Sequence, residues 1–193
     1  MRFLLIFFVA SFMTVQARAE LPIVAGMNFS SLSATSVSGG LLYPASEQGT
    51  TVGFEPFFDT PIEPYISLGL GLPMTINTPG PTSNAGDVGI APRVQLLLPN
   101  FGRIQPFIML SPALSFSRLP TEVWWQGWML REMAGASFAV SGSFRLVAGL
   151  GYTQTRFEGD SPTYVASNGN GPTMHGSVRS SYFTVATGFG VAF

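Results

Sequence analysis

Apolar and polar residues alternate with a period of two along most of this chain. In the closing stretch SSYFTVATGFGVAF, large apolar residues hold one parity and mostly small residues hold the other. This period is typical of a β-strand whose two faces meet different surroundings. The same test predicts eight strands. Their approximate ranges are 23–32, 50–58, 64–74, 87–98, 104–117, 132–140, 144–156 and 179–193.

The connections between these strands alternate in length. Three of them are short and rich in turn-forming residues, and four are longer. The short ones are 59–63, 99–103 and 141–143, and the long ones are 33–49, 75–86, 119–131 and 157–178. This alternation on an even number of strands is typical of an outer-membrane barrel. We therefore expect an all-β fold, an eight-stranded antiparallel up-and-down transmembrane β-barrel.

The residue types on the two strand faces predict which face points outward. A soluble barrel such as a lipocalin is wet outside and would carry charged residues there. Here the less apolar face carries mainly Gly, Ser, Thr and Ala, which suit the crowded interior of a narrow barrel. Only 10% of the residues are charged, against about 25% in an ordinary soluble domain. The large apolar face is therefore predicted to contact lipid.

The N-terminal segment has the features of a signal peptide. Arg2 gives a positive start, residues 3–15 form a short apolar run, and the small-x-small sequence Ala-Arg-Ala at 17–19 is a cleavage site. We expect a cleaved signal peptide at 1–19 and one barrel domain at 20–193. With no cysteine and one histidine, we expect neither a cofactor nor a metal site. All nine basic residues are arginine and form no basic stripe, so nucleic acid is not an expected partner.

The segment after the signal peptide resembles the small bacterial outer-membrane β-barrels of the eight-stranded OmpA/OmpX type. The resemblance implies a C-terminal insertion signal. Its residues here would be Phe183, Val185, Phe189, Val191 and Phe193. It also implies location in a bacterial outer membrane, with outer-membrane lipid and the outer-membrane assembly machinery as partners. We expect a monomer.

Two prolines lie inside predicted strands. Pro92 and Pro112 each remove a donor from the β-ladder, and a closed barrel has no edge on which to place them. The turn at 99–103 brings both prolines to nearly the same height. The sequence therefore predicts a bulge or a locally open ladder there.

Three charged residues fall on the inward parity: Glu55, Arg93 and Arg145. Glu55 and Arg93 differ in height by about 7 Å at the usual strand rise, so their side chains could meet across the lumen. One interpretation is an interior pair that fixes the barrel, and the other is a gate or polar pathway. The inward glycines either leave the lumen underfilled or serve strand curvature.

The third long loop contains EVWWQGWM, which holds Trp124, Trp125 and Trp128. These tryptophans are interpreted either as anchors for a partner or as an aromatic girdle at the membrane interface. In the fourth long loop, His175 and Ser177 are similar to the His-x-Ser of outer-membrane lipid A deacylases. No acid follows Asp160 to orient the histidine, so a solvated loop histidine is the favoured interpretation.

These patterns leave three hypotheses for function. The favoured one is a structural or surface-interaction platform that meets an extracellular ligand through its long loops. The alternative is a narrow channel for small or apolar solutes, and a lipid A-modifying enzyme is the least favoured. Enzymatic activity is not expected, and a general diffusion pore is disfavoured because wide channels have about 16 to 18 strands.

Overall fold

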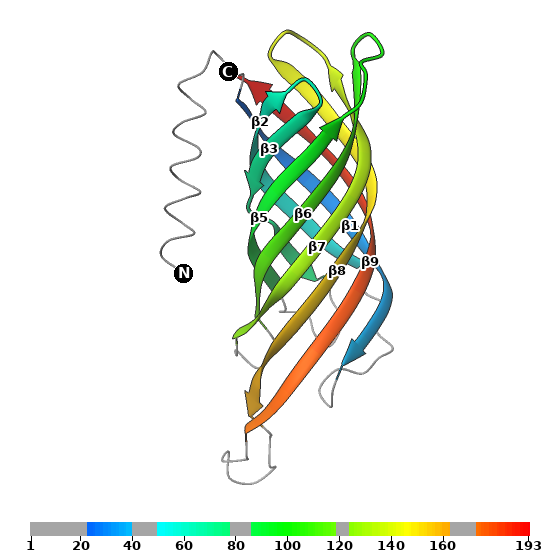
Figure 1. Ribbon diagram of the computed structural model, residues 1–193. Helices are drawn as coiled ribbons and strands as arrows, with labels where there is room; N and C mark the ends of the chain where they lie inside the picture. The colour runs from blue at the N-terminus through cyan, green and yellow to red at the C-terminus, as the bar shows by residue number, and fades with distance from the viewer. Residues whose placement is uncertain (1–22, 40–49, 78–85, 119–123, 163–172) are drawn as a thin grey trace, which may run out of the picture.

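The computed structural model describes residues 23–39, 50–77, 86–118, 124–162 and 173–193, which form antiparallel strands (Figure 1). In chain order these are β1 (Val24–Gly39), β2 (Thr50–Glu63), β3 (Ile66–Gly71), β4 (Met74–Asn77), β5 (Gly86–Leu97), β6 (Ile104–Arg118), β7 (Trp124–Ala139), β8 (Phe144–Pro162) and β9 (Thr173–Ala192). Within these ranges no helix is long and apolar enough to cross a membrane. The predicted signal peptide lies outside them.

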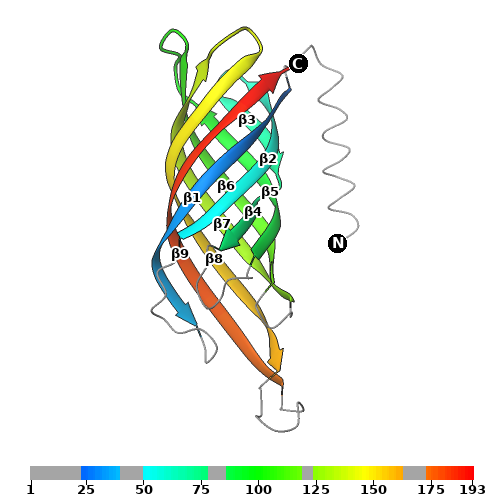
Figure 2. The ribbon, with the colours of Figure 1, turned by 180° about the vertical axis from the view of Figure 1, so that it is seen from behind.

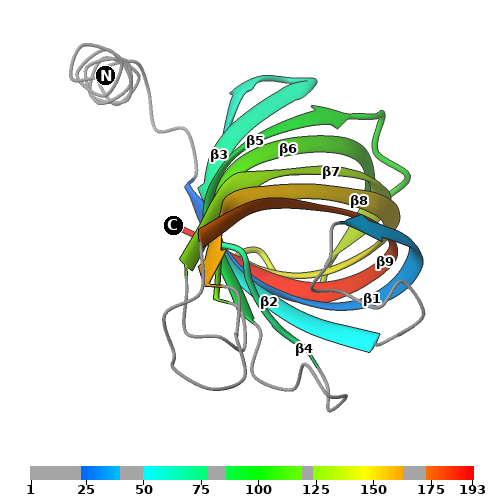
Figure 3. The ribbon, with the colours of Figure 1, turned by 90° about the horizontal axis from the view of Figure 1, so that it is seen from below.

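The strands close into a ring, seen end-on in Figure 3. β1 pairs with β2 on one side and with β9 on the other, so the sheet has no open edge at the join. β3 and β4 are successive segments of one interrupted strand, since both pair with β2 and β5. Each strand position around the barrel wall is called a stave below, so β3 and β4 together form one stave. The interruption falls at Leu72 and Pro73, where proline has no N–H to give the ladder. The ring therefore has eight staves, and the predicted fold is confirmed.

The two faces of the wall differ as the alternation predicts. Inward side chains such as Met109 and Thr153 are buried, with exposed fractions of 1% and 0%. Outward side chains such as Leu114 and Leu150 are exposed at 67% and 56%. A wall with large apolar residues outside needs lipid around it. Four residues of the predicted insertion signal also lie exposed on this wall, namely Phe183, Val185, Phe189 and Phe193, while their role in insertion stays a prediction.

The two ends of the barrel differ in their connections. One end, called the short-turn end below, holds the turns that join β2 to β3, β5 to β6 and β7 to β8, together with the start of β1 and the end of β9 (Figure 1). Gly102 in the β5–β6 turn has a φ of 65°, which glycine adopts without steric cost. The four connections at the opposite end, 40–49, 78–85, 119–123 and 163–172, lie outside the described residues.

Several strands are longer than predicted at the end opposite the short turns. β7 begins at Trp124 rather than at residue 132, and β8 and β9 pair as far as Pro162 and Thr173. Figure 2 shows β8 and β9 extending beyond the other strands. In β8 and β9 the predicted strands ended where the large apolar residues on the outward parity ended. Backbone hydrogen bonding continues past that point, because a ladder does not require an apolar outer face.

The ladder between β5 and β6 is open at the two prolines. Pairing runs to Ile90 opposite Leu114 and resumes at Val94 opposite Leu110, in the same register. Residues 91–93 and 111–113, all within the described part of the chain, form no pairs with each other. Pro92 would face Pro112 in this interval, and neither has an N–H to donate. The predicted open ladder is confirmed.

Candidate functional site within the lumen

Four charged side chains meet inside the barrel and form a central charge cluster: Glu55 and Asp59 of β2, Arg93 of β5 and Arg131 of β7. Glu55 Oε2 lies 3.2 Å from Arg93 Nη1 and 2.6 Å from Arg131 Nη1. Asp59 accepts two hydrogen bonds from Arg93, at 3.0 Å from Nε and 3.1 Å from Nη2. The predicted meeting of Glu55 and Arg93 is confirmed.

Glycines on β3 make room for both carboxylates of this cluster. β3 lies between β2 and β5 in the sheet. A Cβ at Gly69 would overlap the Asp59 carboxylate, and a Cβ at Gly71 would overlap that of Glu55. The space over these inward glycines is therefore filled by neighbouring side chains, so the interpretation of an underfilled lumen is wrong at these positions.

Two members of the cluster were missed by sequence reasoning. Arg131 was placed in a predicted loop, and Asp59 in a predicted turn. Arg131 has the same parity as Met129 and Met133, which lie on the inward face of β7. A strand predicted to start earlier would have revealed it.

The lumen is closed at the level of the cluster. Glu55, Arg93 and Arg131 have exposed fractions of 2%, 3% and 4%. The Arg93 guanidinium also packs over the Phe57 ring, 4.2 Å from its centroid. Beside the cluster, an apolar group from β6, β7 and β9 fills the lumen, and it comprises Phe107, Met109, Met133 and Ala186. A continuous aqueous pore would expose the residues that line it, and these three side chains are buried.

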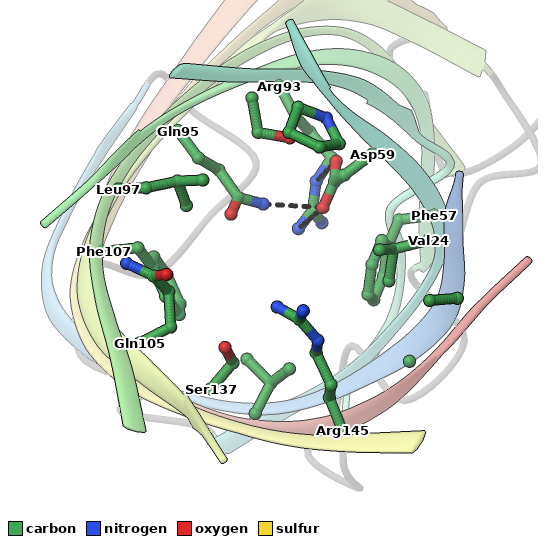
Figure 4. Close-up of a pocket in the computed structure, with 15 residues that line it drawn as sticks. Val24, Phe57, Asp59, Arg93, Gln95, Leu97, Gln105, Phe107, Ser137 and Arg145 are labelled. Carbon is green, nitrogen blue, oxygen red and sulfur yellow. Dashed lines mark hydrogen bonds and ion pairs between the residues drawn. The ribbon is translucent and has the colours of Figure 1, made fainter. Parts of the chain in front are cut away.

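Between the cluster and the short-turn end lies a cavity of about 100 Å³, shown in Figure 4 and called the vestibule below. Asp59 and Arg93 form its inner side, and Gln95 Nε2 donates a 2.6 Å hydrogen bond to Asp59 Oδ2. Arg145 reaches into the vestibule from the opposite wall (Figure 4). Its predicted inward orientation is confirmed, but it does not join the Glu55–Arg93 pair.

On the other side of the cluster the lumen is lined by hydroxyl groups. Thr153 and Thr184 share a 2.7 Å hydrogen bond, and Thr75 donates one of 3.0 Å to Asp87. Trp125, 2% exposed, lies inside the barrel beyond this region. Its indole packs on the backbone of Gly159 and Gly176, where an added Cβ would lie 2.8 Å and 2.7 Å from the ring.

The prediction that the three tryptophans lie in a loop is wrong. All of them belong to β7, where Trp125 points inward and Trp124 and Trp128 point outward, with exposed fractions of 57% and 41%. Alternation along a strand forces this split. The outward pair fits the interfacial-girdle interpretation, whereas Trp125 belongs to the lumen.

The lone histidine also lies in a strand rather than in the predicted loop. In the backbone register of β8 and β9, His175 is opposite Asp160 and Ser177 is opposite Glu158. Acids therefore lie across the ladder from the His-x-Ser pair, although none follows it in sequence. The side chains of residues 160–175 lie outside the described set.

Three solved structures are similar to this chain. They are the crystal structure of Neisserial surface protein A, NspA (TM-score 0.63, 13% identity, covering 89% of this chain and 97% of NspA), that of OprG from Pseudomonas aeruginosa (0.62, 11%, 90% and 96%), and the solid-state NMR structure of AlkL in DMPC bilayers (0.58, 13%, 90% and 90%). No protein-family model matches the chain, and no curated protein matches its sequence. The chain has the fold of the small eight-stranded outer-membrane β-barrels.

Proposed function

We propose that this protein is a sealed barrel of the bacterial outer membrane that acts as a structural or surface-interaction platform, without catalysis. The single observation that carries this proposal is the closed lumen, in which Glu55, Arg93 and Arg131 are all less than 5% exposed. A barrel that is closed at this level has no aqueous route for solutes. Its function would therefore depend on the connections between its strands.

The orientation of the platform follows from its connections. In outer-membrane barrels the short turns face the periplasm and the longer loops face outside. We therefore place the short-turn end in the periplasm and the four connections of the other end at the cell surface. Through them the protein would meet an extracellular ligand, while the apolar wall contacts outer-membrane lipid and the barrel stays monomeric.

Single-channel recording in a planar bilayer tests the seal. The wild-type protein, shown to be folded by its heat-dependent gel mobility, should give no discrete openings. Arg131→Ala removes one of the side chains that close the lumen, and it should raise conductance if the variant remains folded. Reproducible openings of the wild-type barrel would contradict the proposal and favour the alternative, a narrow channel.

Epitope accessibility on intact cells tests the orientation. A tag inserted in connection 163–172 should bind antibody on unbroken cells. The same tag in the β7–β8 turn at 141–143 is the matched control and should bind only after the outer membrane is permeabilised. The reverse result would place the short-turn end outside.

A further inference from the structure

The vestibule holds more positive than negative charge. Two guanidinium groups, those of Arg93 and Arg145, line it, whereas Asp59 is its one lining carboxylate. Both oxygens of that carboxylate are already engaged, because Arg93 binds Oδ1 and Oδ2 and Gln95 binds Oδ2. Asp59 therefore has little capacity left to neutralise the second arginine.

Arg145 is the cation that this arrangement leaves without a counterion. Among the described residues it forms no ion pair, and its Nε is buried without a hydrogen-bond partner. Figure 4 shows its guanidinium directed into the vestibule, toward the Arg93–Asp59 pair. An anion in the vestibule would give this Nε an acceptor and the guanidinium a counterion, and such charge-assisted hydrogen bonds are stronger than neutral ones.

The other residues that line the vestibule determine which kind of anion fits. Gln105 and Ser137 offer polar contacts, and the ring of Phe107 and the side chain of Val147 are apolar. A volume of about 100 Å³ corresponds to roughly three waters at the liquid volume of about 30 Å³ each. This space admits a carboxylate with a short alkyl chain. A guanidinium fork binds such a carboxylate with two parallel hydrogen bonds.

We propose that the vestibule is a binding site for a small carboxylate, held by Arg145 and entered from the short-turn end. The central charge cluster closes the far side, so the vestibule is a pocket rather than part of a pathway. The carboxylate could come from a free short-chain acid or from the C-terminus of a peptide whose last residue enters the mouth. Both sources share the chemistry that Arg145 recognises.

Nuclear magnetic resonance of the folded barrel in detergent tests this site directly. With arginine labelled by ¹⁵N, the Nε–H signal of Arg145, assigned by its loss in Arg145→Gln, should shift on titration with butyrate. Arg145→Gln should weaken butyrate binding at least tenfold, measured by saturation transfer to the ligand. Arg145→Lys, which keeps the charge but loses the fork, should fall between the two.

Arg103 provides the matched control, since it is exposed in the β5–β6 turn at the same end of the barrel. Arg103→Gln should bind butyrate as the wild type does. Equal binding by wild type and Arg145→Gln would overturn the site, as would the absence of butyrate and peptide binding to a folded wild-type barrel. Inorganic phosphate binding as tightly as butyrate would overturn the carboxylate assignment.

A competition experiment separates the two sources. A short apolar peptide with a free C-terminus should displace butyrate if the site takes chain ends, and its amidated form should not. If neither peptide competes, the site takes the free acid. Displacement by the amidated peptide as well would show that the carboxylate is not the recognised group, and would overturn the proposal.

Discussion

Replacing Glu55 by glutamine should destabilise the barrel strongly, because it removes an anion that two buried arginines share. Glu55 Oε2 is the shared acceptor of Arg93 and Arg131. After Glu55→Gln, Arg93 keeps its paired hydrogen bonds with Asp59. Arg131 forms its one ion pair within the described residues with Glu55, so the substitution leaves it buried without an anion.

The expected loss in the free energy of unfolding is about 3–5 kcal/mol, the usual cost of removing one partner of a buried ion pair. The pair formed by Arg156 and Glu158 on the outer wall is the control. Its N–O distance is 2.5 Å, but the two side chains are 38% and 44% exposed. Exposed pairs contribute up to about 1 kcal/mol, so Glu158→Gln should cost much less despite the shorter contact.

Equilibrium urea unfolding in lipid vesicles, followed by gel mobility and tryptophan fluorescence, measures both losses. A double-mutant cycle with Arg131→Met should show a coupling energy within the range of about 0.5–3 kcal/mol, because the double variant leaves no orphaned charge at that position. Equal losses for Glu55→Gln and Glu158→Gln would refute the reasoning, since burial would then have no effect.

Three further predictions concern single positions. Gly71→Ala places a Cβ against the neighbouring carboxylate and should cost about 1–3 kcal/mol in urea unfolding, whereas Gly142→Ala meets no atom within 4 Å and should change little. Arg179 lies directly opposite Arg156 in the ladder, so Arg179→Glu should stabilise the barrel by about 0.2–1 kcal/mol, and no gain at low salt would contradict this. His175→Ala should leave lipid A acylation unchanged by mass spectrometry, and a difference from cells expressing the wild type would revive the enzyme hypothesis.

The period-two pattern was sufficient to predict the staves within the apolar wall. It failed beyond that wall, where Arg156 and Glu158 point outward and the outer face is no longer apolar. The tryptophans were misplaced for a different reason. At the start of β7 large apolar residues lie on both parities, with Trp125 inward and Trp128 outward, so the alternation is lost and this segment was assigned to a loop. Backbone hydrogen bonding between strands continues where hydrophobic alternation stops. A sequence pattern shows the alternation but not the hydrogen bonding, so it underestimates the length of the strands.

The lumen was predictable only in part for a related reason. Parity placed Glu55, Arg93 and Arg145 inside, and all three lie there. The pairing of carboxylates with guanidinium groups depends on the register and the stagger of strands that are far apart in the sequence. Parity along one strand gives no information about either. Arg131 therefore entered the cluster only through the structure, 76 residues from the carboxylate that it contacts.

The lumen is closed by two kinds of interaction that different substitutions can separate. The charge cluster depends on the pairing of charges, whereas the adjacent contact of Met109 with Met133 depends on volume. Glu55→Gln combined with Arg131→Met removes the charges but nearly keeps the side-chain volume, so this variant should show no conductance. Met109→Ala combined with Met133→Ala keeps the charges and opens space beside them. If conductance appears only in the second variant, packing closes the lumen and the ion pairs serve to fix the staves.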